Sequence, residues 1–426
     1  MSAKHYDWSD GPAQIEDHSL TKQEVLVDYI RRYLKQCTLL PEMEVFRMTL
    51  VDGFCGGGVY VREQNPGTLV LGSPLQKLDA VESASREINL PRQKPIRFDI
   101  QFIFVDVNPT ATAFLREQLI QRGYESRLGC SIWVLTEKFT NVYDQIIRKV
   151  CDHSRGSPRA LFFLDQYGYS QIPMPVIADI FERIGHAEVI LNLHTSSLMT
   201  YINDEILERA CQSLGITDVR SAMGGHSVAD LKRTEAGARK LIQCALYRSV
   251  ADGCKAKHYT PFFIRGRAGH GEYWLLHLSQ KHRARDVMSR VTWEKSNSFI
   301  HYGGAGLGML NVEMMGFDQQ LDDHQVDNGY LFDDDARIQS TQQLRNDLAP
   351  IIYGLQGPIT FQGLYERYCN ECPGDAELFK LSVMELVDAK EITVRTTDGG
   401  RRESALRIHD SDIIERSGTV SMFSLG

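Results

Sequence analysis

The stretch VDGFCGGGVY, residues 51–60, constrains the fold more than any other part of the sequence. It follows an apolar run at 46–51 that is typical of a buried strand, and it places three consecutive glycines after an aspartate and an aromatic residue. Glycine has no Cβ and tolerates positive φ, so such a turn brings backbone N–H groups close to a ligand. An ordinary tight turn has the same composition, and the stretch alone leaves both interpretations open.

Apolar runs alternate with helical patterns through the first half of the chain. We expect an amphipathic helix over 19–34 that begins at Ser19, and then strands at 46–51, 100–105, 130–135, 160–164 and 188–193 with helices between them. Strands separated by helices imply right-handed crossovers and a mostly parallel sheet. A helical insertion is expected at about 204–255, followed by strands at 260–265 and 273–279 that form an antiparallel hairpin.

The second and fourth expected strands end in carboxylates. Asp106 closes the second strand and precedes Val107, Asn108 and Pro109, where the next helical pattern begins. An ionised aspartate at a strand end accepts hydrogen bonds from ribose hydroxyls, which is what a nucleoside site requires. The alternative is that Asp106 or Asn108 caps the following helix. Both interpretations fit the sequence.

Composition narrows the class of protein. A net charge of −8 does not indicate a nucleic-acid binder, so such a role depends on local basic patches. No apolar run approaches the roughly 18 residues that cross a bilayer, and we expect a cytoplasmic protein with no membrane partner. Nine scattered cysteines argue against a disulfide framework, and the single close pair, Cys369 and Cys372, predicts helix packing and no metal.

The C-terminal part differs in pattern from the rest. We expect residues 301–340 to be a linker and 341–426 to be a winged helix domain, with helices at 343–353, 361–368 and 376–389 and two strands around the turn at 398–400. Arginines near this hairpin and after residue 280 predict contacts with a phosphate backbone: Arg283, Arg285, Arg395, Arg401 and Arg402. A protein-binding winged helix and a solvated helix face are the alternatives.

Together these motifs resemble the three-Cys-motif partner protein family, TcmP, over roughly residues 15–300. That family is similar to class I S-adenosylmethionine-dependent methyltransferases. The resemblance implies a Rossmann-like α/β sheet, mostly parallel with an antiparallel last strand, in a domain spanning 1–300. It also implies a partner protein with three cysteines that resembles radical S-adenosylmethionine enzymes. The motifs are His18 and Lys22, the turn at 52–58, Gly72-Ser73-Pro74, FVDVNP around Asp106, FFLDQYG around Asp165, and YWLLHLS.

The resemblance also implies roles for single residues. Asp165 and Tyr167 lie where amino-directed methyltransferases carry a motif that hydrogen-bonds the acceptor amine and stacks on a flipped base. The family's proline is replaced here by Gln166, which relaxes the backbone. The alternative is that Asp165 caps the next helix and Tyr167 packs in the core. By the same resemblance, Asp106 holds the ribose of the cofactor. The methionine end of the cofactor is then lined by Asp52, Phe54, Gly56 and Gly58.

Three functional hypotheses follow. The first is an S-adenosylmethionine-dependent methyltransferase that modifies DNA or RNA together with a partner protein. The second is a non-catalytic binding or adaptor protein on the same scaffold, which Gln166 favours. The third, a dehydrogenase, is disfavoured because the GxGxxG fingerprint and its acidic residue about 20 positions on are absent.

Overall fold

The structure is a computed structural model. It describes residues 6–15, 17–62, 65–166, 168–193, 201–217, 219–234, 238–265, 272–295, 299–301, 305–307 and 330–417. The chain divides into two compact units, one formed by residues 1–219 and 249–291 and the other by 220–248 and 292–426. From the sequence we expect domains at 1–300 and 341–426 with a linker at 301–340, and these boundaries remain a prediction.

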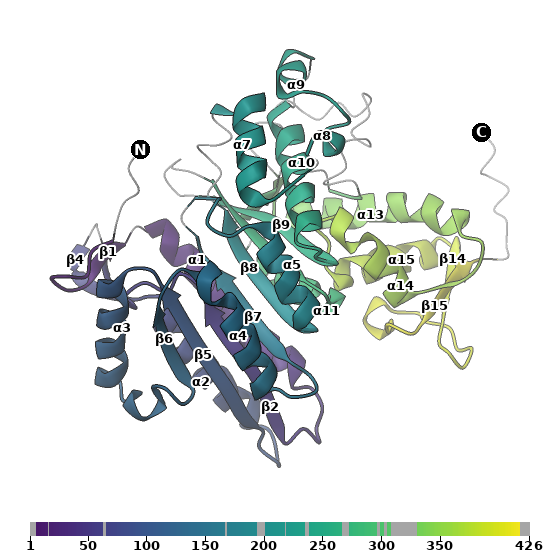
Figure 1. Cartoon of the computed structure of the whole chain (residues 1–426). Helices are drawn as coiled ribbons and strands as arrows, with labels where there is room; N and C mark the ends of the chain where they lie inside the picture. The colour runs from purple at the N-terminus through teal and green to yellow at the C-terminus, as the bar shows by residue number, and fades with distance from the viewer. Residues whose placement is uncertain are drawn as a thin grey trace. The chain divides into compact units, whose positions relative to one another are not determined.

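The first unit is built on a twisted sheet whose strands run in the order β6-β5-β2-β7-β8-β10-β9. The first five are parallel, and β10 is antiparallel to both β8 and β9. The predicted mostly parallel sheet with an antiparallel last strand is therefore confirmed (Figure 1). The strands are β2 (Val45–Asp52), β5 (Arg97–Asp106), β6 (Ile132–Thr136), β7 (Arg159–Leu164), β8 (His186–Leu193), β9 (His258–Arg265) and β10 (Glu272–Ser279).

Helices cover both faces of this sheet. The chain moves from β2 through β5 to β6 in one direction and returns through β7 to β8 in the other. Right-handed crossovers therefore place α2 and α3 on one face and α4 and α5 on the opposite face. Figure 1 shows α4 and α5 in front of the sheet, and α1 packs against α2. The bounds are α1 (Asp17–Cys37), α2 (Ser73–Asn89), α3 (Pro109–Gln121), α4 (Phe139–His153) and α5 (Met174–Arg183).

Helix α1 carries the apolar face that the sequence predicts, but it begins earlier than expected. The helix starts at Asp17, so Ser19 lies inside its first turn and is not its first residue. The apolar positions are all less than 9% exposed, which confirms the amphipathic pattern: Val25, Leu26, Tyr29, Ile30, Tyr33 and Leu34.

A small three-stranded sheet separates the glycine turn from α2, and the sequence did not reveal it. Strands β3 (Val59–Arg62) and β4 (Asn65–Leu71) form a hairpin, and β1 (Ala13–Ile15) pairs with β3 in parallel. The Gly72 N–H donates to the Gly58 carbonyl at 2.7 Å, so the two ends of the inserted hairpin meet. The alternation of apolar and polar residues in β3 and β4 is so short that the sequence pattern alone does not distinguish these strands from a loop.

The predicted helical insertion between β8 and β9 is confirmed. Its described residues include α7 (Asp204–Leu214), α8 (Val219–Ala222), α9 (Val228–Thr234) and α10 (Ala238–Gly253). Helix α7 is capped at both ends. The Asn203 side chain accepts from the Ile206 N–H at its start, and Gly215 terminates the helix at φ +70°. After β10 follow α11 (His282–Lys295), β11 (Phe299–His301) and β12 (Tyr330–Leu331).

The second unit contains the predicted winged helix. Its helices are α13 (Asp334–Gly354), α14 (Phe361–Tyr368) and α15 (Ala376–Asp388), and its strands are β13 (Ile359–Thr360), β14 (Ile392–Arg395) and β15 (Ile413–Arg416). The strands pair in the order β13-β15-β14. Asp333, Thr360 and Asp375 cap the three helices with their side chains, which also explains why α13 starts nine residues before the predicted position.

One detail of the predicted wing was wrong. We expected the second strand to follow the turn at 398–400 directly, but only a single bridge, between Arg395 and Arg401, forms there. The chain then leaves the sheet for a short 3-10 helix at Ala405–Arg407, and the paired strand is β15, further along the chain. The expected linker lies largely outside the described residues.

In the described part of the chain, no helix is both long enough and apolar enough to cross a membrane.

The central strand β7 gives a direct test of the core. Leu161 on β7 is fully buried, so Leu161→Ala should lower the free energy of unfolding by about 2 to 5 kcal/mol, because it removes buried methyl groups and leaves a cavity. Urea unfolding followed by tryptophan fluorescence measures the change. Leu90→Ala is the matched control, since Leu90 is 89% exposed, and it should shift stability by no more than about 0.5 kcal/mol. Equal effects of the two changes would contradict this description of the core.

Candidate functional site

The carboxyl ends of four adjacent parallel strands carry polar side chains in one region of the first unit. Asp52 ends β2 and Asp106 ends β5, while Asp165 directly follows β7 and Asn192 lies near the end of β8. In open α/β sheets, ligands bind outside these strand ends, where the strand order reverses. The reversal here falls between β2 and β7, so Asp52 and Asp165 flank it.

Asp52 is bonded within the protein. Its Oδ2 accepts from Ser73 Oγ at 2.6 Å and from Lys77 Nζ at 2.5 Å, and Lys77 also donates to Ser73. Asp52 and Lys77 are 1% and 2% exposed, so this is a buried ion pair. Lys77 Nζ also lies 4.1 Å from the centre of the Phe163 ring. Asp52 therefore ties the glycine turn to the first two turns of α2.

The glycines of the turn are required by close contacts within the chain. Gly56 and Gly58 have φ of +60° and +78°, the left-handed region that favours glycine. A Cβ on Gly57 would collide with the indole of Trp8, whose Nε1–H donates to the Val59 carbonyl at 3.3 Å. The N-terminal segment thus packs closely on one side of the turn, and Trp8 is a site residue that the sequence did not reveal.

Asp106 holds the turn from the neighbouring strand. Its Oδ2 accepts from the Gly56 N–H at 2.8 Å and its Oδ1 from the Asn108 N–H at 2.8 Å. Burial raises the pKa of Asp106, although these backbone hydrogen bonds oppose the rise. The sequence left open whether Asp106 or Asn108 caps the next helix. Asn108 caps α3, because its side chain accepts from the Thr110 N–H at 2.9 Å. Asp106 keeps lone pairs for a ligand.

Asp165 forms a second ion pair. Lys22 Nζ, from α1, lies 2.6 Å from Oδ1 and 2.5 Å from Oδ2 of Asp165, and Asn192 Nδ2 donates to Oδ1 at 2.8 Å. Burial alone would raise the pKa of Asp165, but the Lys22 ammonium and the hydrogen bonds from Lys22 and Asn192 hold this pKa below its ordinary range. Asp165 does not cap the next helix, because Pro173 occupies the cap position of α5.

Gln166 organises the loop that follows Asp165. Its Oε1 accepts from the N–H groups of Gln171 at 2.8 Å and Ile172 at 3.1 Å, so a buried side chain fixes the turn that a proline would otherwise restrict. Within the described residues, Gln166 Nε2 and Asn192 Oδ1 are buried without a hydrogen-bond partner. Tyr167 lies outside the described residues, as does the side chain of His18.

The predicted arginines differ in exposure and in their partners. Arg285 is fully buried, whereas Arg283 on the same helix is exposed. In the wing, Arg395 pairs with Glu415 at 2.7 Å and Arg402 makes two bonds to Asp412 at 2.7 and 3.1 Å. Arg401 is exposed. Residues 333–417 include sixteen acidic and ten basic side chains, so this part of the chain repels polyanions overall.

Cys369 and Cys372 are buried in the second unit. Across the described ranges, no group of three or more histidine, cysteine, aspartate or glutamate side chains is arranged to hold a metal.

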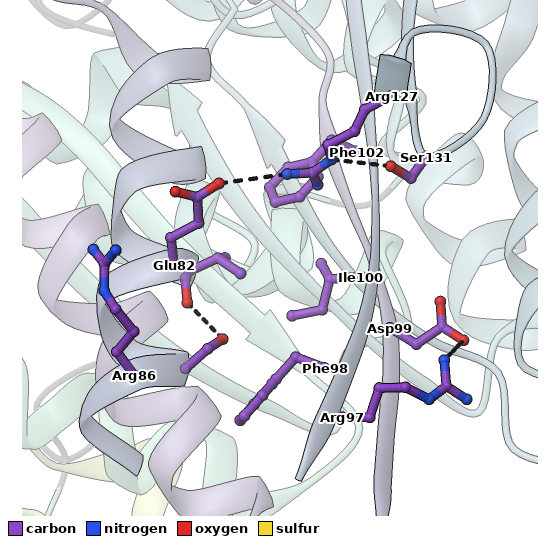
Figure 2. Close-up of a pocket in the computed structure, with 11 residues that line it drawn as sticks. Glu82, Arg86, Arg97, Phe98, Asp99, Ile100, Phe102, Arg127 and Ser131 are labelled. Carbon is purple, nitrogen blue, oxygen red and sulfur yellow. Dashed lines mark hydrogen bonds and ion pairs between the residues drawn. The ribbon is translucent and has the colours of Figure 1, made fainter. Parts of the chain in front are cut away.

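A cavity of about 580 Å³ lies elsewhere in the first unit (Figure 2). It is lined by α2 and by the first half of β5, and Arg127 closes one side through bonds to Glu82 at 3.4 Å and Ser131 at 3.1 Å. Asp99, which also lines it, is seven residues before Asp106, or about 23 Å along an extended strand. The cavity is therefore separate from the candidate site.

The strand order, the antiparallel β10 and the glycine turn after β2 define a Rossmann-like sheet of the class I methyltransferase type, followed in the chain by a winged helix unit. A family model described as GMT-like wHTH domain matches residues 316–399. This match covers the winged helix as far as residue 399 and no part of the Rossmann-like sheet. No curated protein matches the sequence.

Solved structures resemble the chain only distantly. The plantazolicin methyltransferase BamL, in complex with a triazolic desmethylPZN analog and SAH, is 10% identical over 62% of this chain and 85% of its own, with a TM-score of 0.26. A SAM-dependent methyltransferase from Agrobacterium tumefaciens is 10% identical over 61% and 62%, with a TM-score of 0.29. Magnesium protoporphyrin IX methyltransferase (ChlM) from Synechocystis PCC 6803, with bound SAH, is 11% identical over 62% and 84%, with a TM-score of 0.26.

Removing the Lys77 ammonium should destabilise the protein. Lys77→Met leaves the Asp52 carboxylate buried and without its counter-ion, so the free energy of unfolding should fall by about 3 to 5 kcal/mol. Urea unfolding at neutral pH measures this. The control Lys94→Met removes an exposed ammonium and should change stability by less than about 0.5 kcal/mol. A loss below about 1 kcal/mol for Lys77→Met would show that the pair is not held as described.

The lowered pKa of Asp165 predicts a pH dependence. Because the folded-state pKa lies below that of the unfolded chain, the stabilisation from Asp165 is complete above the unfolded value of about 3.9 and is lost as the pH falls through the folded value. The difference in unfolding free energy between the wild type and Asp165→Asn should therefore be constant from pH 7 to about 5 and shrink below about 4. A difference that grows on acidification would contradict the assignment.

Proposed function

We propose that the chain is an S-adenosylmethionine-dependent methyltransferase. The observation that carries the proposal is the position of Asp106, which closes β5 and holds the Gly56 N–H of the turn that follows β2. A carboxylate at the end of the second strand beside a glycine turn after the first is the arrangement that binds a nucleoside with its ribose hydroxyls donating to the carboxylate. It occurs here in a sheet of the methyltransferase type.

The residues present fit this cofactor, with one change of role. Asp106 is only partly buried and its oxygens have lone pairs left for ribose hydroxyls. Phe54 is also partly exposed and stays a candidate for the methionine end, together with Gly56 and Gly58. Asp52 is committed to Lys77 and Ser73, so it supports the turn and does not bind the ligand amine directly. The cofactor supplies an electrophilic methyl group, and the protein aligns the acceptor with it.

The partner and the target belong to the same proposal. The resemblance to the TcmP family supports a partner protein with a three-cysteine motif, and a winged helix is a common platform for nucleic acid or protein. Among the predicted arginines, Arg283, Arg395 and Arg401 are exposed. Arg395 pairs with Glu415, so Arg283 and Arg401 are the ones that would contact phosphates. The acidic composition of residues 333–417 and the ion pairs of Arg395 and Arg402 favour a protein surface over a polyanion at the wing.

A binding or adaptor protein without turnover is the second candidate function. It is favoured by Gln166 in place of the family's proline and by the bonding of both Asp165 oxygens to Lys22. This alternative predicts cofactor binding without methyl transfer to DNA, RNA or a partner protein.

Calorimetric titration tests the cofactor. S-adenosylmethionine should bind with micromolar affinity and NAD should not bind, while Asp106→Ala should weaken S-adenosylmethionine by about a hundredfold, because the ribose hydroxyls lose a charged acceptor.

The control is Asp99→Ala on the same strand. Asp99 pairs with Arg47 and Arg97 at the opposite end of β5, so this change should leave the affinity within about twofold. Unchanged affinity in Asp106→Ala, or equal loss in both variants, would refute the assignment of Asp106. If the wild type binds neither compound, the glycine turn is purely architectural and the methyltransferase proposal fails.

A further inference from the structure

The ion pair between Lys22 and Asp165 bears on which atom receives the methyl group. Lys22 comes from the helix that precedes the first strand of the parallel sheet, whereas Asp165 follows the fourth, so 143 residues separate the two partners. The Asp165 side chain is 37% exposed and the Lys22 side chain is 11% exposed. The carboxylate is thus only partly buried, with an ammonium bonded to both of its oxygens.

The charge that develops during methyl transfer distinguishes the two acceptor classes. An amine nitrogen becomes more positive as it bonds the methyl carbon, and it needs an uncompensated carboxylate to stabilise that charge. Lys22, at 2.5 and 2.6 Å, neutralises the carboxylate of Asp165. A hydroxyl oxygen becomes more negative as its proton leaves, and a neighbouring cation stabilises that charge.

The described groups next to Asp165 add no negative charge that would offset Lys22. Asn192 donates to Asp165 through its amide nitrogen, so it adds a donor and no negative charge. Lys77 also acts electrostatically on Asp165, but its own charge is paired with Asp52. Asn192 Oδ1 is buried without a hydrogen-bond partner among the described residues.

We propose that the Lys22–Asp165 pair selects a hydroxyl, and not an amine, as the methyl acceptor. This inference rests on the proposed methyltransferase function. The hydroxyl oxygen takes the methyl group from the sulfonium and displaces a neutral thioether, which keeps the electron pair of the broken C–S bond. The hydroxyl proton passes to water, and Lys22 stabilises the negative charge that develops on the oxygen.

Two cofactor analogues test this without a substrate. S-adenosylhomocysteine lacks the methyl group, while sinefungin carries an ammonium where the methyl group would face the acceptor. Calorimetry gives the ratio of their affinities. The wild type should bind sinefungin no more tightly than S-adenosylhomocysteine, because the pair has no net charge. Lys22→Met leaves the carboxylate without its counter-ion and should raise the affinity for sinefungin about tenfold. Asp165→Asn leaves the ammonium without its counter-ion and should lower the affinity for sinefungin about tenfold.

The controls separate this inference from the function on which it rests. S-adenosylhomocysteine should bind all three proteins within about twofold, and Lys94→Met, which removes an exposed ammonium, should leave both affinities unchanged. Sinefungin at least tenfold tighter than S-adenosylhomocysteine in the wild type would show a site for a cationic acceptor and overturn the inference. So would a ratio that stays constant in Lys22→Met and Asp165→Asn.

Each variant tests the inference separately, so it stays testable if one of them does not fold. Circular dichroism identifies such a variant, and the expected shift for the other stands alone. If the wild type binds neither analogue, the proposed function fails and the inference fails with it; if it binds both with the ratio unaffected, only the inference fails.

Discussion

The buried ion pair between Lys77 and Asp52 fixes the point on which the rest of the site depends. It joins the last residue of β2 to α2, although the hairpin β3–β4 is inserted between them. Two buried charges are tolerated only when they neutralise each other and are further hydrogen-bonded, as Ser73 does here. With α2 anchored in this way, the hairpin closes through Gly72 and Gly58, and the glycine turn keeps one geometry.

The second ion pair gives the strand ends their chemical character. Acidic groups at the ends of β2, β5 and β7 would repel one another if all stood uncompensated. Lysines from α1 and α2 compensate Asp165 and Asp52, and backbone N–H groups solvate Asp106. Asp106 is thus the strand-end carboxylate that no lysine of the described residues pairs with, and it is the one suited to a neutral donor such as a ribose hydroxyl.

The winged helix unit uses its charges differently. Arg395 on β14 pairs with Glu415 on β15, and Arg402 pairs with Asp412, which directly precedes β15. These ion pairs fix the wing and neutralise the two guanidinium groups. Helix α15 presents Glu377, Leu381 and Asp388 to solvent. An acidic and partly apolar helix face suits a protein surface better than a duplex.

The sequence by itself determined the sheet, the helical insertion and the winged helix, because each depends on apolar periodicity within a short window. It also placed Asp106 and Asp165 at strand ends, because an apolar run that stops at a carboxylate marks its own end. It missed β1, β3 and β4, which are short, and it placed the second wing strand too early. Only the tertiary structure decided which charges meet. Lys22 and Asp165 are 143 residues apart, and Arg285 is buried while Arg283 is exposed. Such pairings depend on how helices lie across the sheet, and no local pattern encodes a contact between distant side chains.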